Sequence, residues 1–189
     1  IADKYNELDV DYVNGYFEAL PEDSKNGMQH MFKNETYYMT DNLNALQGAF
    51  TVDIRTPYCY FGPGYQDAFT VIHEIGHYYA DLNNDTSWLC FDLCEVHSQG
   101  NEMLFLNYLG TVLDPKVFEA LEAYKLYAFV NTIVQATLMD NFEEIVYNLS
   151  FEESYTTADF DAIMHEVIRS YGIDDSDEYT YASLDWLWR

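Results

Sequence analysis

The chain has 189 residues, 49% of them hydrophobic and 17% aromatic, which is enough to build a core, and we expect a single domain over residues 1–189. Eight Lys and Arg oppose 33 Asp and Glu, giving a formal net charge of −25. Charge of this sign repels phosphate backbones and anionic lipid headgroups, so neither nucleic acid nor a membrane is an expected partner.

The chain has three cysteines, Cys59, Cys90 and Cys94, and no two of them have the CxxC spacing. We therefore expect reduced, buried thiols rather than a disulfide framework, as is typical of a reducing compartment. No apolar stretch has the length of a membrane span and no signal peptide is visible. The sequence begins at Ile1 rather than Met, which indicates a trimmed start. On these grounds the expected location is cytoplasmic.

The first third of the chain mixes helix and strand signals. Residues 3–20 carry apolar residues at helical spacing and stop at Pro21, and the polar stretch that follows contains a short helix. Aromatic and β-branched residues then predict strands. These strands form a small antiparallel layer over residues 35–40, 48–54 and 58–61.

The rest of the chain has helical periodicity almost throughout. Gly110 is expected to end one helix, Asp114 and Pro115 to begin the next, and Thr157 to cap the last before Gly172. The long run after Pro115 is expected to break or bend near Asp140 and Asn141. Helices are thus predicted over about 67–82, 88–109, 115–148 and 158–171, followed by a solvated acidic loop at 174–178.

A His-Glu-Ile-Gly-His sequence lies inside the apolar stretch FTVIHEIGHYYADL, residues 69–82. On a helix, His73 and His77 are one turn apart on the same face, so both can bind one zinc ion. Glu74 is next to the first of them and can reach a water at the metal. This is the HExxH pattern of zinc peptidases. Buried His and Glu need partners, which argues against a chance match.

A catalytic zinc needs a third protein ligand, and the segment CEVHSQGNE, residues 94–102, offers candidates. Glu95 and Glu102 are seven residues apart and so differ by roughly 20° around a helix, with Ser98 on the same side. We choose Glu95 as the third ligand, and expect Ser98 and Glu102 to hold ligand side chains in place. His97 lies roughly 160° from Glu95 and is a poor ligand if Glu95 is one. A solvent-facing helix edge is the alternative explanation of this polar stripe.

The sequence HEIGHYYADL followed by CEVHSQGNEMLFL resembles the oligoendopeptidase F and thimet oligopeptidase family of zinc metallopeptidases, and the likeness covers about residues 48–150. It implies a mainly α-helical, gluzincin-type catalytic domain with one zinc, and cleavage within short unstructured peptides. By the same match His73, His77 and Glu95 are the zinc ligands and Glu74 is the general base.

The chain also departs from that family. Members of the family are much longer, and they supply late Tyr and His side chains that donate hydrogen bonds to the developing oxyanion. Tyr179 and Tyr181 are the candidates for that role here, although they cannot be matched position by position and two packing aromatics are the alternative. Remaining segments of a longer peptidase are therefore expected partners, besides peptide substrates.

Three functions stay open from the sequence. The first is a zinc metalloendopeptidase. The second is a zinc-binding domain whose catalytic site is incomplete and whose role is structural or peptide-binding. The third is a zinc aminopeptidase, which also uses a Glu as third ligand, although no segment here resembles the Gly-Ala-Met-Glu-Asn sequence of that group.

Overall fold

The computed structural model describes residues 10–53, 55–83, 91–150 and 153–173. The chain divides into two compact units, residues 1–122 and 123–189. The helices and strands of the first unit are α2 (Val10–Ala19), α3 (Glu22–Met28), α4 (His30–Lys33), β1 (Tyr37–Met39), β2 (Ala49–Asp53), β3 (Pro57–Phe61), α5 (Ala68–Leu82) and α6 (Phe91–Val112). Helix α7 (Pro115–Tyr147) runs from the first unit into the second, which also contains α8 (Thr157–Ser170).

The three strands form one sheet in the order β1-β3-β2. Strand β3 pairs antiparallel with β2, so that Thr51 lies opposite Cys59, and parallel with β1, so that Tyr38 lies opposite Tyr60. The expected wholly antiparallel layer is therefore wrong, and the sheet is mixed. Strand β3, rather than β2, lies next to β1, and these two strands run parallel.

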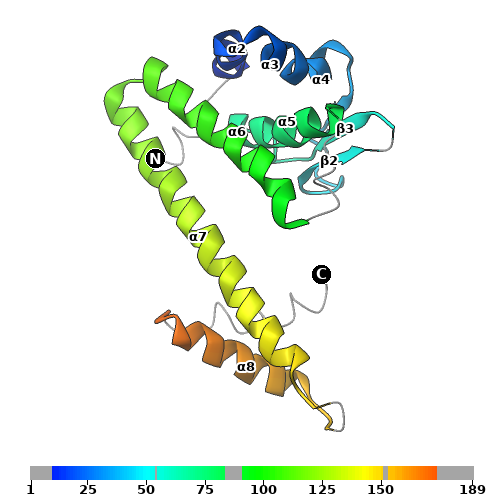
Figure 1. Cartoon of the computed structure of the whole chain (residues 1–189), viewed down its shortest axis with the longest axis vertical. Helices are drawn as coiled ribbons and strands as arrows, with labels where there is room; N and C mark the ends of the chain where they lie inside the picture. Colours follow the sequence, from blue (N-terminus) through cyan, green and yellow to red (C-terminus); the bar gives the residue numbers. More distant parts are fainter. Residues whose placement is uncertain (1–9, 54, 84–90, 151–152, 174–189) are drawn as a thin grey trace. The chain divides into compact units, whose positions relative to one another are not determined.

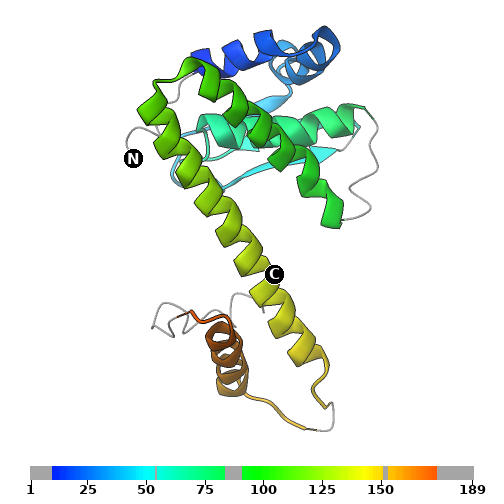
Figure 2. The ribbon, with the colours of Figure 1, turned by 60° about the vertical axis from the view of Figure 1, so that its left-hand side comes forward.

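Helix α5 lies at the centre of the first unit. It packs against β2 and β3 on one side and against α2, α3 and α6 on the others. Figure 2 shows α5 lying along the sheet with α6 crossing it. The residues that fill this core are almost fully buried, among them Phe17, Phe61, Ile72, Tyr78 and Phe105. An apolar helix that is covered on most sides is what the stretch FTVIHEIGHYYADL requires.

The start of α5 is fixed by Asp67. Its Oδ1 accepts hydrogen bonds from the backbone N–H groups of Phe69 and Thr70, at 3.1 and 3.2 Å, and its Oδ2 accepts from the Thr70 hydroxyl at 2.6 Å. These bonds satisfy backbone donors that a helix start leaves open. The predicted helix over 67–82 is thus confirmed to within a residue.

Helix α6 comes very close to α5 at Gly76. A Cβ at this position would be 2.6 Å from the Cα of Ser98 and 2.8 Å from the carbonyl oxygen of His97. Only a glycine allows this approach. A second contact joins the helices nearby, where the buried Asn101 side chain donates to the Ile72 carbonyl at 2.7 Å and accepts from the Tyr16 hydroxyl at 2.7 Å.

Two predicted helix ends are wrong. Helix α6 continues past Gly110 to Val112, and α7 runs without interruption through Asp140 and Asn141. Figure 1 shows α7 as one continuous helix. Around the expected break, Leu138 and Phe142 are buried with the apolar face of α8, and such packing outweighs the weak helix propensity of Asp and Asn.

The second unit has a small core of its own, formed by Leu138, Phe142, Met164, Val167 and Ile168. Its last helix is capped one residue earlier than expected, at Thr156, whose backbone N–H donates to Asp159 Oδ2 at 2.7 Å. The single domain expected over residues 1–189 stays a prediction, because two compact units can belong to one domain or to two. Among the described helices, none combines the length and apolar character needed to cross a membrane.

Candidate metal and catalytic site

The HExxH residues lie on α5 as the helical spacing predicts. His73 and His77 project from the same side of the helix, with ring centroids 5.0 Å apart and planes at 77°. Both side chains are about one fifth exposed, at 24% and 19%. The imidazoles therefore sit at the border between the core and an open cavity, where they are held by packing and still reachable.

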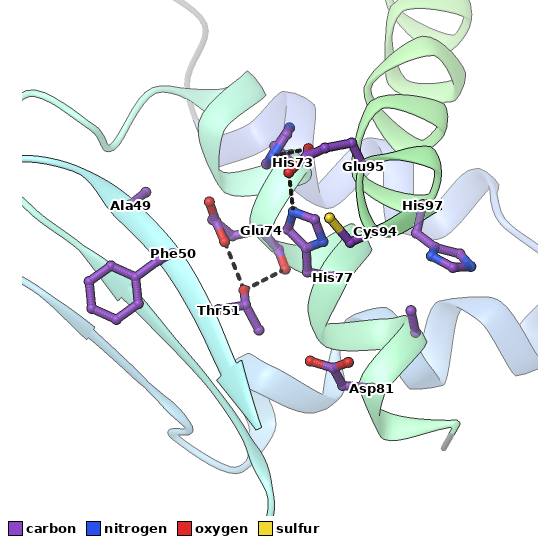
Figure 3. Close-up of a pocket in the computed structure, with 11 residues that line it drawn as sticks. Ala49, Phe50, Thr51, His73, Glu74, His77, Asp81, Cys94, Glu95 and His97 are labelled. Carbon is purple, nitrogen blue, oxygen red and sulfur yellow. Dashed lines mark hydrogen bonds and ion pairs between the residues drawn. The ribbon is translucent and has the colours of Figure 1, made fainter. Parts of the chain in front are cut away.

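Glu95 on α6 faces both rings. Its Oε2 lies 3.2 Å from His73 Nε2, and its Oε1 lies 3.6 Å from His77 Nε2. One ligand atom from each of the three residues falls within 4.8 Å of the other two. Figure 3 shows the three side chains converging from α5 and α6. The structure thus brings together the three residues that the sequence nominated as ligands.

This arrangement fits a zinc ion. Ligand atoms at 2.0–2.1 Å from a tetrahedral zinc are about 3.3–3.4 Å apart, and the two measured contacts of Glu95 bracket this value. Two imidazoles and one carboxylate also form a ligand set typical of catalytic zinc, which keeps a fourth position open.

Glu102, about two turns after Glu95 on α6, orients His73. Its Oε1 accepts a hydrogen bond from His73 Nδ1 at 2.8 Å, which leaves Nε2 directed at Glu95. Burial lowers the pKa of His73, but the bonds to Glu102 and Glu95 outweigh it and raise that pKa to about 9. A carboxylate behind a ligating imidazole fixes the ring and raises its basicity.

His77 has the opposite electrostatic balance. Burial lowers its pKa, the charge of Glu95 works against this, and the neighbouring His73 lowers it further. The backbone of Cys94 hydrogen-bonds the His77 ring. The net result favours the neutral imidazole, which is the form that binds a metal.

The carboxylate of Glu95 is kept ionised. Its hydrogen bond with His73 lowers its pKa most, burial opposes this, and a bond from Ser98 lowers it further, to about 2. The Ser98 hydroxyl, fully buried, lies 2.8 Å from Glu95 Oε2. Ser98 and Glu102 thus each contact a candidate ligand.

Glu74 projects into the same cavity from α5 and is 5% exposed. Thr51 of β2 donates to it, with the Thr51 Oγ1 2.8 Å from Glu74 Oε2 and 3.1 Å from the Glu74 carbonyl oxygen (Figure 3). Burial raises the pKa of Glu74, while the Thr51 bond and His73 act against the rise. A raised pKa suits a carboxylate that must both accept and return a proton near neutrality.

The cavity has a volume of about 370 Å³. One wall comes from β2, another from α5 and a third from α6, and the lining residues are Ala49, Phe50, Thr51, His73, Glu74, His77, Ala80, Asp81, Cys94, Glu95 and His97. His97 lines the cavity but is not in the three-residue metal group, in keeping with its angular position on α6.

Sequence reasoning missed Thr51, which reaches Glu74 only because β2 lies directly over α5. The only signal was its place in the strand that precedes the HExxH helix. The two candidate oxyanion donors, Tyr179 and Tyr181, lie outside the described residues, and so does the loop at 174–178.

No protein-family model matches the chain, and no curated protein sequence matches it. Among solved structures, the chain is similar to a protein assigned as oligoendopeptidase F, with a TM-score of 0.70 and 15% sequence identity. The similarity covers 94% of this chain and 34% of that protein, so this chain spans about a third of its length. At this identity the match shows the fold alone, and the expected mainly helical fold with a small sheet is confirmed.

Proposed function

We propose that this chain is a zinc metalloendopeptidase that cleaves within short, unstructured peptides. The observation that carries the proposal is the position of Glu74, buried at the cavity wall beside three side chains whose ligand atoms lie within 4.8 Å of one another. The likeness in fold to a protein assigned as oligoendopeptidase F supports the same reading.

His73, His77 and Glu95 would hold the metal, with Glu102 and Ser98 keeping two of them in orientation. When bound, zinc would polarise the scissile carbonyl and lower the pKa of a water toward about 7. Glu74 would take the proton of the attacking water and then return it to the leaving amine. Thr51 bonds Glu74 Oε2, which leaves Oε1 for this proton.

The substrate backbone has a natural place beside β2. This strand ends the described sheet on the side of the cavity, since the order is β1-β3-β2 and Ala49, Phe50 and Thr51 all line the cavity. An extended peptide can add to such an edge through main-chain hydrogen bonds. Its scissile bond would then pass over Glu74, which is held by a side chain of the same strand.

The test is cleavage of an internally quenched peptide that is blocked at both ends. The wild type, reconstituted with zinc, is expected to cleave it, and chelation followed by zinc readdition should abolish and restore the activity. Glu74→Gln is expected to keep its zinc and lose cleavage. Glu119→Gln, which removes an exposed carboxylate on α7 outside the cavity lining, is the matched control and should cleave as wild type does.

Blocked ends distinguish an endopeptidase from an aminopeptidase, because the latter needs a free amine. Cleavage of only the unblocked peptide would replace the proposal with the aminopeptidase. Bound zinc without cleavage of either peptide would instead favour a catalytically incomplete domain, in which the missing donors belong to other segments of a longer peptidase.

A further inference from the structure

Three aromatic rings form a row across one face of the sheet. Each strand contributes one: Tyr38 from β1, Tyr60 from β3 and Phe50 from β2. They are partners in register, Tyr38 opposite Tyr60 and Phe50 opposite Tyr60. Their rings stack, with centroids 6.1 Å apart at 23° for the first pair and 5.0 Å apart at 21° for the second. We call these three residues the aromatic row.

The aromatic row lies on the face of the sheet turned away from α5. Side chains alternate along a strand, and on β2 Thr51 points to Glu74 of α5 while Phe50 points the other way (Figure 3). Tyr38 and Phe50 are 53% and 38% exposed. The middle ring is fixed, because the Tyr60 hydroxyl donates to the Leu46 carbonyl at 2.8 Å.

The row ends at the strand that borders the cavity. Phe50 belongs to β2, the last strand of the described sheet, and Phe50 and its neighbours Ala49 and Thr51 line the cavity. A peptide that adds to the edge of β2 becomes the fourth strand. It places one residue opposite Phe50, with its Cβ about 4.5–5.5 Å away and its side chain on the same face as the row.

We infer that Phe50, the ring of the aromatic row on the edge strand β2, selects peptides that carry an aromatic side chain at the position opposite it, so that the substrate supplies a fourth ring to the row. This rests on the proposed function, since it requires a peptide along β2. Stacked or edge-to-face pairs are worth more than the burial of area alone. Alternation along the strand directs the flanking substrate residues to the other face of the sheet, toward α5 and away from the aromatic row.

The occupant is a peptide rather than a nucleobase, which would also stack on such a surface. The chain carries a formal net charge of −25, which repels phosphate backbones. The row is also continuous with the strand and cavity that serve the peptide in the proposed function.

The experiment measures binding, so that it does not depend on turnover. Zinc-loaded Glu74→Gln protein is titrated into fluorescently labelled, end-blocked peptides of alanine in which one Phe is moved along the chain. At one position Phe is expected to tighten binding about two- to tenfold over the all-alanine peptide. Adding Phe50→Ala should reduce this gain to less than about twofold, while Phe50→Tyr preserves it.

Tyr38→Ala is the matched control, because it removes a ring from the same row but two strands from the edge of β2. It should leave the gain from Phe unchanged, and a thermal melt of each variant verifies that the sheet is intact. A Phe-dependent gain that survives Phe50→Ala, or no gain at any position in a protein that binds peptides, would overturn the inference. A change in sedimentation with Phe50→Ala would overturn it too, by assigning the row to a second copy of the chain.

The two proposals fail separately in these assays. Cleavage by the wild type without any effect of Phe50→Ala on the choice of peptide refutes the role of the aromatic row and leaves the endopeptidase standing. Selective binding through Phe50 without cleavage by the wild type refutes the endopeptidase and leaves a peptide-binding surface.

Discussion

Gly76 sets the distance between the two helices that carry the candidate metal ligands, and Gly76→Ala tests its importance. The new Cβ would lie 2.6 Å from the Ser98 Cα and 2.8 Å from the His97 carbonyl oxygen, both backbone atoms that cannot swing aside. Ordinary contact begins at 3.4 Å, so α5 and α6 would have to separate by about 0.8 Å there. Glu95 lies one turn from Ser98 on the same helix and would move with it.

Overpacking of this kind typically costs about 1–3 kcal/mol, but alanine is also a better helix former than glycine by about 1 kcal/mol. Gly100→Ala is the control that separates these terms. Gly100 lies in α6, and a Cβ there meets nothing within 4 Å. The gain in helix propensity is common to both variants, so the difference between them isolates the clash. We expect Gly76→Ala to be less stable than Gly100→Ala by about 1–3 kcal/mol.

The assay is urea unfolding of both variants in the presence of a chelator, which removes any contribution from metal. Zinc affinity is then measured separately by competition with a chromophoric chelator. A ligand set that has lost its spacing should bind zinc about 10- to 100-fold more weakly in Gly76→Ala, with Gly100→Ala unchanged. Equal stability and equal zinc affinity in the two variants would refute the reasoning, because it would mean that the helices separate freely at this point.

Three further predictions concern the groups around the metal site. Thr51→Val removes the hydrogen bond to Glu74 and should lower kcat about tenfold or more, with the zinc content unchanged. Thr51→Ser keeps the hydroxyl and should restore kcat. Steady-state kinetics together with metal analysis tests both variants, and a full loss of activity in Thr51→Ser would contradict the prediction. Glu102→Gln removes the negative charge that contacts His73 Nδ1 and should weaken zinc binding about 10- to 100-fold. Zinc affinity is measured by competition with a chelator, and an unchanged affinity would mean that the contact has no role in metal binding. Burial raises the pKa of Cys59 to about 12, so its thiol stays neutral near pH 8. Cys59 should therefore resist iodoacetamide in the folded chain and react after denaturation, as measured by peptide mapping with mass spectrometry. Rapid alkylation of Cys59 in the native state would contradict this prediction.

Most of the candidate site could be predicted from the helical periodicity of the sequence. The spacing of His73 and His77 on one helix, and of Glu95, Ser98 and Glu102 on another, fixed which side chains share a face. These are local relations, and the structure preserves them with contacts of 2.8–3.6 Å. The distance between α5 and α6 could not be predicted from the periodicity of either helix. It depends on Gly76, whose role appears only once Ser98 is seen beside it.

Relations between elements were harder to predict. Alternation in a strand shows which residues share a face but not which strand is the partner, so the parallel pairing of β1 with β3 was missed. The contact of Thr51 with Glu74 was missed for the same reason. The prediction of a helix break at Asp140 and Asn141 was wrong because helix propensity contributes little free energy, and burial of Leu138 and Phe142 outweighs it.

The central claim is that His73, His77 and Glu95 hold one zinc ion beside Glu74. The most direct measurement is native mass spectrometry of the chain after exposure to zinc and removal of the excess, comparing the wild type with His77→Ala. The account predicts one zinc per wild-type chain and loss of stoichiometric zinc in the variant. A wild type that retains no zinc, or a variant that retains it in full, would contradict the claim.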